Sequence, residues 1–291
     1  MMTLIADSGS TKTDWLLTAE PASPFHSAST LFRTQGITPV HQDDEQIAAI
    51  LRDELLPQLA AHQSAAAWDG VCSICFYGSG VLPDQEERMA RLLRTAFTAL
   101  CPQPTAPLHI EAHSDLLGAA RALCGEHEGL ACILGTGANS CLYDGERIVA
   151  NTPPLGYILG DEGSGAVLGK RFLNALYKNL LDDGTKAAFE ATMNASLAEV
   201  IDRVYRQPMP NRWLASLSPF IHTQLANPAV ETLVIDNFSD FIARNIAPYR
   251  RLDLPLQAVG SIAYHYREQL CKAAQKAGYA VGKILRSPLQ A

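Results

Sequence analysis

The chain has 291 residues, of which 47% are hydrophobic and 18% charged, and its formal net charge is −7. This length is long for a single hydrophobic core, so we expect two domains. The negative charge argues against a nucleic-acid partner and against binding to an acidic membrane surface.

The first predicted elements are two short strands, residues 3–6 and 15–18. Between them, residues 7–14 read Asp-Ser-Gly-Ser-Thr-Lys-Thr-Asp and are predicted to form the tip of a β-hairpin. A Walker loop would place Gly-Lys-Ser/Thr at the start of a helix, whereas here the chain returns as a strand. A tip of small residues can still bind phosphate through its N–H groups, with an acid holding hydrated Mg²⁺. An ordinary polar turn is the alternative.

The rest of the first half alternates between helices and strands. A third extended stretch is expected near residues 27–34. It is followed by a helix (46–61), a buried strand (71–77), a helix (86–100), a strand (108–111) and a helix (116–124).

A second hairpin resembles the first. Residues 131–134 are an apolar run, residues 135–140 (Gly-Thr-Gly-Ala-Asn-Ser) a small polar tip, and residues 141–143 a return strand that leads to another at 147–150. Later helices are expected at 166–181, 187–204, 232–246 and 264–277, with a strand at 254–260. Two halves that each begin with a three-strand meander indicate a duplicated fold with a cleft between the halves.

Three further segments carry candidate chemistry. Gly260 and Ser261 join a strand to a helix, where glycine permits close approach of a ligand such as adenosine; an ordinary junction is the alternative. Asp115 lies at a strand-to-helix turn. We interpret it as the N-cap of that helix, as a base that accepts the proton of a hydroxyl nucleophile, or as both. Residues 160–165 read Gly-Asp-Glu-Gly-Ser-Gly and either present two acids to a ligand such as a sugar or cap the following helix.

In their order and spacing, these segments resemble those of the sugar-kinase/actin/heat-shock-chaperone superfamily. Within it, they resemble the N-acetylglucosamine kinases grouped with the BadF/BadG/BcrA/BcrD ATPases, over essentially the full chain. The resemblance implies an α/β protein of two lobes, each with the ribonuclease-H-like (actin-like ATPase) fold, and an interlobe cleft. Residues 1–117 would form the N-terminal lobe, with the C-terminal segment 283–291 as an optional addition, and residues 118–282 the C-terminal lobe.

The resemblance also implies an activity. The chain would be a kinase that uses ATP and Mg²⁺ to phosphorylate the 6-hydroxyl of an amino sugar, with N-acetylglucosamine as the expected acceptor. Asp115 matches the catalytic base, and Asp7 would hold Mg²⁺ through water. The residues implied to bind the cofactor are Ser8, Gly9, Ser10, Thr11, Lys12, Thr136, Gly137, Ala138, Asn139, Gly260 and Ser261. Those implied to bind the substrate are Gly36, Thr38, Asp115, Gly156, Tyr157 and Asp161.

Departures from the family pattern leave the acceptor open. Relatives often carry an Asn in the substrate loop where this chain has Thr38, whose hydroxyl lacks the donor and acceptor pair of an amide. Glucosamine or another hexose is therefore an alternative acceptor. The chain ends at residues 287–291, where the family pattern continues for a few residues, so the terminal segment is expected to be shortened.

Two other functions remain as alternatives. A BadF-type ATPase that activates a partner enzyme needs cysteines at a subunit interface for an iron–sulfur cluster, and no second cysteine obviously pairs with Cys124. A sugar sensor would be expected to carry a helix-turn-helix before Thr3 or a zinc-cysteine motif, and both are missing. The expected partner is a small-molecule sugar, with a homodimer left open, and neither nucleic acid nor a membrane.

The same sequence predicts a cytoplasmic protein. No apolar run approaches the roughly 18 residues of a transmembrane helix, and the N-terminus lacks the basic segment of a signal peptide. Seven cysteines, an odd number, are typical of reduced thiols. Cys72 and Cys75 match C-x-x-C, but residues three apart on a strand point to opposite faces, so we predict no metal site there.

Overall fold

The computed structural model describes residues 2–19, 29–62, 71–100 and 107–290. The chain divides into two compact units, Met1–Gly118 and Ala119–Ala291, so the division falls one residue after the expected boundary. Residues 27 and 28 of the expected third strand, and Cys101, lie outside the described residues. Each unit is considered by itself.

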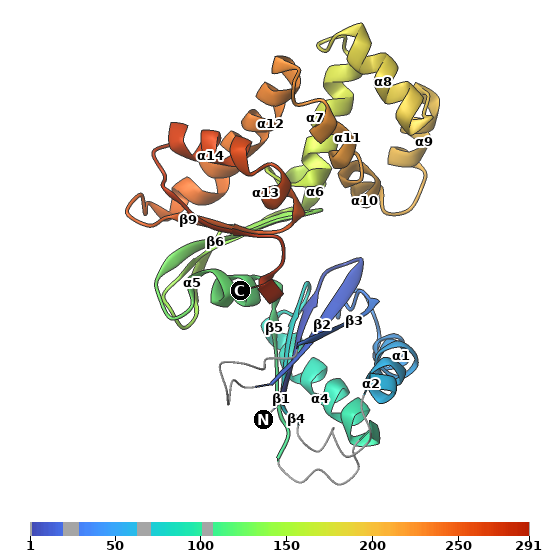
Figure 1. The fold of residues 1–291 in the computed structure, drawn as a ribbon, viewed down its shortest axis with the longest axis vertical. Coiled ribbons are helices and arrows are strands. Elements are labelled where there is room, and N and C mark those ends of the chain that lie inside the picture. The colour runs from blue at the N-terminus through green and yellow to red at the C-terminus, as the bar shows by residue number, and fades with distance from the viewer. Residues whose placement is uncertain (1, 20–28, 63–70, 101–106, 291) are drawn as a thin grey trace. The chain divides into compact units, whose positions relative to one another are not determined.

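The first unit is built on a five-stranded sheet of order β3-β2-β1-β4-β5 (Figure 1). Three strands form an antiparallel meander: β1 (Met2–Ser8), β2 (Lys12–Ala19) and β3 (Thr30–Gln35). Two more, β4 (Val71–Gly78) and β5 (His109–Ser114), extend the sheet in parallel from β1. This order brings the end of β1 beside the end of β4, and the end of β4 beside the end of β5.

Helices bury the apolar side chains of this sheet. One helical stretch consists of α1 (Asp44–Ala49), a π-helical turn (Ile50–Leu55) and α2 (Leu56–His62). Asp43 starts it with a capping box, because its carboxylate accepts the Gln46 N–H. Then α4 (Pro83–Leu100) packs against β5, and α5 (Asp115–Cys124) follows β5 directly. The core includes Leu4, Ala6, Trp15, Ile47, Leu51, Ile74, Phe76, Met89 and Leu93.

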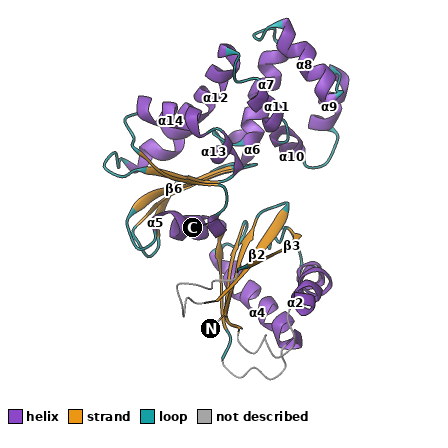
Figure 2. Cartoon of the chain, in the orientation of Figure 1, coloured by secondary structure: helices purple, strands orange, loops and turns teal. Residues whose placement is uncertain are grey.

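The second unit repeats this sheet, with order β10-β9-β6-β7-β8. Here β6 (Gly129–Leu134), β7 (Ala138–Tyr143) and β8 (Ile148–Asn151) form the antiparallel meander. Two parallel strands, β9 (Leu256–Val259) and β10 (Val281–Leu285), complete it. Both sheets therefore share one strand order, which confirms the expected duplicated ribonuclease-H-like fold. Each unit combines its sheet with helices (Figure 2). Residues 283–285, expected as an addition to the first lobe, instead lie in β10, because this strand pairs with β9.

A long helical region separates β8 from β9. Its helices are α6 (Gly156–Leu159), α7 (Gly165–Tyr177), α8 (Asp183–Met193), α9 (Leu197–Tyr205), α10 (Pro210–Ala215), α11 (Ser218–Thr223) and α12 (Pro228–Phe241). A π-helical turn (Ile242–Ile246) and a 3-10 turn (Ala247–Tyr249) follow, and α13 (Ser261–His265) and α14 (Arg267–Lys276) lie between β9 and β10. Within this unit, α8 and α9 lie at the end away from the sheet (Figure 1).

The single helix predicted over residues 187–204 is wrong. Asn194 adopts a left-handed conformation with φ 43°, which ends α8, and Ser196 then caps α9 with its own capping box. The rings of Phe172 on α7, Phe189 on α8 and Phe220 on α11 pack together with centroids 5.6 to 5.8 Å apart. Among the described residues, no helix is both long and apolar enough to cross a bilayer.

Candidate functional site

The first hairpin tip is shorter than predicted. Asp7 pairs with Asp14 and Ser8 with Thr13 in the strand register, so only residues 9–11 form the turn. The Gly9 N–H closes this turn on the Lys12 carbonyl at 3.0 Å. The prediction of a tip over residues 7–14 is therefore corrected to a three-residue tip. Ser10 and Thr11 are exposed on it.

Two residues expected to bind the cofactor use their side chains inside the first unit. The buried Ser8 hydroxyl lies 2.6 Å from the Thr13 hydroxyl and donates to the Ile37 carbonyl at 2.9 Å. Lys12 forms an ion pair with Asp14, which also accepts from Arg33 at 2.7 Å. Burial opposes ionisation, but these two cations hold the pKa of Asp14 below its usual value. A phosphate at this tip would therefore meet the backbone and the exposed residues Ser10 and Thr11, and not the side chains of Ser8 and Lys12.

The loop predicted to bind the sugar lies against this tip. The Gly36 N–H donates to the Thr11 carbonyl at 3.3 Å, and a Cβ on Gly36 would lie 2.8 Å from the Ser10 carbonyl oxygen. Thr38 is buried, and its N–H donates to Gln42 Oε1 at 2.7 Å. No hydrogen bond joins the Thr38 hydroxyl to another described residue, and this oxygen is not fully enclosed. It can therefore meet a ligand.

Asp115 is the first residue of α5 and is half-buried. The Ser114 hydroxyl accepts the Leu117 N–H at 3.2 Å and so makes the capping bond that was one interpretation of Asp115. The Asp115 carboxylate instead accepts its own N–H and that of Leu116. Burial and the negative charge of Asp7 outweigh these bonds and raise the pKa of Asp115 to about 6.

The first unit contains oxygen donors that suit magnesium. Asp7 and Asp115 are close enough that the charge of Asp7 raises the pKa of Asp115. No group of three or more metal-ligating side chains occurs in the described part of the chain. Magnesium is usually held by one or two carboxylates, with waters and substrate phosphates completing its shell. These two residues therefore fit Mg²⁺ held partly through water.

The second hairpin tip is also a three-residue turn, residues 135–137, instead of the predicted 135–140. The Gly135 N–H donates to the Gly137 carbonyl at 2.9 Å. Ala138 and Asn139 lie in β7, where the Asn139 side chain accepts from Asn151 at 2.9 Å. The N–H groups of Thr136 and Gly137 donate to no acceptor within the residues that the structure covers. This tip therefore offers backbone donors to an anion.

Gly260 lies beside the second tip, because β9 and β6 are parallel neighbours that end together. Its φ of 117° is accessible only to glycine, and a Cβ there would collide with the Leu134 carbonyl and lie 3.3 Å from the Gly135 nitrogen. Ser261 follows as the exposed first residue of α13. Because the backbone at Gly260 lies this close to the second tip, a nucleotide can lie along both the tip and the segment 260–261.

Left-handed backbone conformations occur on both sides of α6, at its start and in the acidic turn that follows it. Leu155 has φ 62°, Gly156 has φ 72° and Asp161 has φ 56°. Gly156 is exposed with open space where a Cβ would be, while Tyr157 packs partly against the core and its carbonyl accepts from Lys170 at 2.9 Å. Strained backbone of this kind is concentrated at ligand sites.

The carboxylate of Asp161 lies against the second tip. A Cβ on Gly137 would lie 3.1 Å from Asp161 Oδ2, and the Ala138 N–H donates to the carboxylate. Burial, with a smaller contribution from Glu162, raises the pKa of Asp161 to about 6. Glu162 itself bonds to Arg244 at 3.1 Å and to Asn245 at 3.3 Å.

Asn237, which no sequence motif indicated, supports the acidic turn. Asn237 is fully buried, accepts the Gly163 N–H at 3.3 Å and donates to the Ser164 carbonyl at 3.3 Å. A lone amide on the buried face of α12, beside Val234 and Phe238, is the signal that could have identified it.

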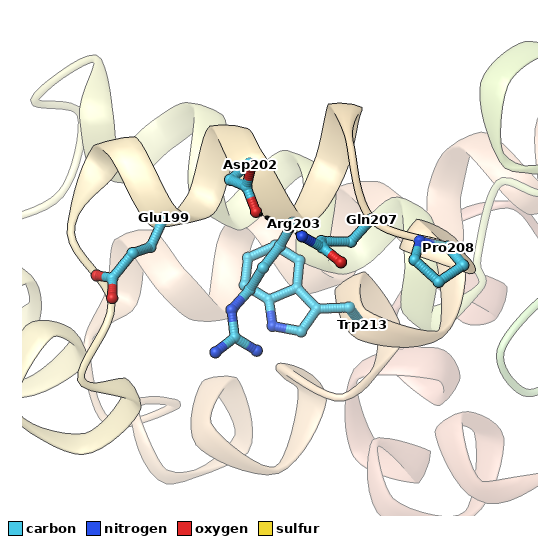
Figure 3. Close-up of a pocket in the computed structure, with 6 residues that line it drawn as sticks. All are labelled: Glu199, Asp202, Arg203, Gln207, Pro208 and Trp213. Carbon is cyan, nitrogen blue, oxygen red and sulfur yellow. Dashed lines mark hydrogen bonds between the residues drawn. The ribbon is translucent and has the colours of Figure 1, made fainter.

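A surface pocket of about 470 Å³ lies elsewhere in the second unit, between α9 and α10 (Figure 3). The Arg203 guanidinium covers the Trp213 ring at 5.7 Å from its centroid. The lining residues are Glu199, Asp202, Arg203, Gln207, Pro208 and Trp213. None of these is a predicted site residue, so we do not assign this pocket to a nucleotide or sugar.

The predicted site residues thus form two groups, one in each unit. The first unit brings together Asp7, Asp115, the tip 9–11 and the loop 36–38. The second brings together the tip 135–137, the acidic turn 160–165 and Gly260.

A solved structure from Porphyromonas gingivalis, named a "putative N-acetylglucosamine kinase", is 47% identical to this chain. The alignment covers 99% of this chain and 96% of that one, with a TM-score of 0.88. The chain belongs to the N-acetylglucosamine kinase family. This agrees with the family resemblance that the sequence motifs carry.

A second solved structure supports the fold of this family member. The protein from Chromobacterium violaceum, also named a "putative N-acetylglucosamine kinase", is 18% identical, with 99% of this chain and 96% of that chain covered and a TM-score of 0.67. At this identity the likeness shows the fold alone. No protein-family model matches the chain, and no curated protein sequence matches it.

Proposed function

We propose that this chain is a kinase that transfers the γ-phosphoryl group of ATP to the 6-hydroxyl of an amino sugar, with N-acetylglucosamine as the acceptor. The observation that carries this proposal is the 47% identity, over 99% of the chain, to the protein from P. gingivalis. The geometry of the described residues is compatible with each role that the reaction requires.

Asp115 is the proposed catalytic base. The N–H groups of Asp115 itself and of Leu116 favour the ionised form of this carboxylate, which is the form that accepts a proton. In the proposed reaction it accepts the proton of the sugar hydroxyl as the new O–P bond forms. Proton transfer by a positioned side chain of this kind contributes roughly 10²- to 10⁴-fold to a rate.

The remaining residues would position the substrates. Asp7 would hold Mg²⁺ through water, and the bound ion would neutralise charge on the phosphates. The tips 9–11 and 135–137 would bind the phosphates through their N–H groups, and Gly260 and Ser261 would lie along the adenosine. Positioning and electrostatics provide most of the catalysis in phosphoryl transfer.

The family resemblance implies sugar contacts in each unit. Gly36 and Thr38 are the proposed contacts in the first unit, and Gly156, Tyr157 and Asp161 those in the second. The unpaired Thr38 hydroxyl is a donor and acceptor suited to one sugar substituent. Because this contact involves one hydroxyl, it does not by itself select one sugar, and the phosphoryl acceptor has to be measured directly.

Substitution of Asp115 tests the base assignment. We expect Asp115→Asn to bind ATP as the wild type does but to lose about 10²- to 10⁴-fold in sugar-dependent ADP release, measured with a coupled assay. Asp84→Asn is the matched control, because Asp84 is an exposed acid in the first turn of α4. Undiminished phosphorylation by Asp115→Asn would overturn the assignment.

A panel of acceptors tests the substrate. The wild-type protein is assayed with N-acetylglucosamine, glucosamine, glucose and N-acetylmuramic acid, and we expect the highest kcat/KM with N-acetylglucosamine. If no sugar increases ADP release above the sugar-free rate, the kinase proposal is wrong. Visible absorption by the purified protein would instead favour an iron–sulfur activator.

A further inference from the structure

The Asp161 carboxylate makes a contact that a sugar-binding role does not require. It accepts the N–H of Ala138, the first residue after the second tip, and lies where a side chain on Gly137 would be. Ala138 is buried, so water has little access to replace this acceptor. The contact therefore depends on both the carboxylate and the absence of a side chain at residue 137.

The backbone of the acidic turn holds Asp161 in place for this contact. Its φ of 56° is a left-handed conformation, which Asp and Asn tolerate better than most residues other than glycine. The Asp161 N–H donates to the Pro154 carbonyl at 2.9 Å, and the Asp161 carbonyl accepts the Ser164 N–H at 3.0 Å. Two hydrogen bonds thus maintain a conformation that is unfavourable on its own.

Backbone hydrogen bonds join the same turn to the tip at two further points. The Gly165 N–H donates to the Gly135 carbonyl at 2.8 Å, and the Ala166 N–H donates to the Thr136 carbonyl at 3.2 Å. With the bond from Ala138, the turn restrains the tip on both sides of Gly137. The tip N–H groups without a described acceptor are those of Thr136 and Gly137.

We propose that Asp161 is a positioning residue that holds the second tip in the shape that binds nucleotide phosphate, whether or not sugar is bound. By accepting the Ala138 N–H, Asp161 fixes the peptide that ends the tip and leaves the two preceding N–H groups as the donors for phosphate. This inference rests on the proposed function, because it requires a nucleotide at this tip.

Three variants separate positioning from sugar contact. Asp161→Gly removes the carboxylate while permitting φ 56°, so the backbone of the turn can be retained. Asp161→Asn keeps an acceptor oxygen and tolerates the same conformation. Leu155→Gly is the matched control, since it relieves a left-handed conformation on the other side of the short helix α6 without removing an acceptor.

The measurement is the Kd for Mg²⁺-ATP by titration calorimetry without sugar, with the thermal midpoint recorded for each variant. We expect Asp161→Gly to bind about tenfold more weakly or worse, because a buried N–H loses its acceptor, and Asp161→Asn to stay within about threefold of the wild type. Leu155→Gly should match the wild type. If Asp161→Gly does not fold, Asp161→Ser provides the same test, since its hydroxyl is too short to keep the bond.

Two results would overturn the inference, and they are distinguishable. If Asp161→Gly binds ATP like the wild type but shows a raised KM for the sugar, Asp161 is a sugar ligand and does not position the tip. If the wild-type protein itself binds no nucleotide, the proposed function is wrong, and this inference is wrong with it.

Discussion

Ionisation of the Asp161 carboxyl destabilises the fold. Burial is the largest contribution that raises its pKa to about 6, while the Ala138 N–H opposes the shift. In the unfolded chain this carboxyl has its ordinary pKa of 3.8, so between pH 3.8 and about 6 the folded chain holds a proton that the unfolded chain has released. The stabilising contribution is therefore present below pH 3.8 and is lost as the pH rises through about 6.

We accordingly expect Asp161→Asn to gain stability relative to the wild type as the pH is raised from about 4.5 to about 7. Urea unfolding of both proteins across this range measures the difference. Asp44→Asn serves as a pH-independent control, since Arg88 holds the pKa of Asp44 below its usual value of 3.8 and Asp44 is therefore ionised in both states across this range. A stability difference for Asp161→Asn that does not change with pH would contradict the expectation.

Gly36 is a second residue whose replacement has a calculable steric result. A Cβ there would collide with the Gly9 carbonyl and lie 2.8 Å from the Ser10 carbonyl oxygen. Because both are backbone atoms, the first tip would have to move, and we expect Gly36→Ala to lower the free energy of unfolding by about 2 kcal/mol. Gly135→Ala, where a Cβ meets nothing within 4 Å, should change it by no more than about 0.5 kcal/mol. Equal urea midpoints for the two variants would show that the loop at Gly36 yields more easily than its contacts indicate.

At the scale of elements, α12 holds the acidic turn through a single side chain. Asn237→Ala would leave the Gly163 N–H and the Ser164 carbonyl without their partner, and we expect a loss of about 2 kcal/mol in unfolding free energy. The exposed Asn174 on α7 supplies the control, Asn174→Ala, for which little change is expected. Denaturant unfolding measures both. A loss no larger than that of the control would mean that water replaces the amide.

Both hairpins were predictable from sequence, because each combines strand-forming runs with a tip of small polar residues. Their lengths were overestimated, since Thr13 and Asp14 are polar and yet lie in β2. Their hydrogen-bond partners, Ser8 and Arg33, come from other strands. A polar strand residue whose hydrogen bonds are made by a side chain distant in sequence is therefore easily mistaken for a turn residue.

The helical region of the second unit was less predictable. Apolar spacing indicates helices correctly, but it does not show the break at Asn194, where a left-handed residue ends one helix. Strand β10 was missed because it contains glycine and lysine and lacks apolar alternation. It is a strand because β9 supplies hydrogen-bonding partners along its edge.

The residues of the candidate site were likewise predictable only in part. Segments whose function lies in their own backbone, such as the two tips and Gly260, can be recognised from short motifs. The contact between Asp161 and Ala138 joins the start of β7 to a turn that follows β8 and α6, and it depends on a left-handed backbone conformation. Sequence alone therefore indicates that Asp161 is placed near a ligand, but not which loop its carboxylate supports.

On the scale of the whole molecule, the two units have separate hydrophobic cores that share no residue. We therefore expect two unfolding midpoints in urea, each reported by its own tryptophan. Trp15 is fully buried in the first core, and Trp213 packs against the second. Proteins that keep only one of these tryptophans, with Trp68 and the other replaced by Phe, are compared by fluorescence. Coincident midpoints would show that the units unfold as one cooperative system.

The register of the second sheet also affects how the chain is made. In the first sheet Met2 pairs with Val71, whereas in the second Leu130 pairs with Leu256, beyond the whole helical region α6 to α12. Chains emerge from the ribosome N-terminus first, and pairings that close long loops form slowly. All five strands of the first unit are thus synthesised before β6. The apolar strand β6, in contrast, has no parallel partner until β9 has been synthesised. The interval of synthesis between residues 134 and 256 is therefore when the nascent chain is most exposed to aggregation and most dependent on chaperones.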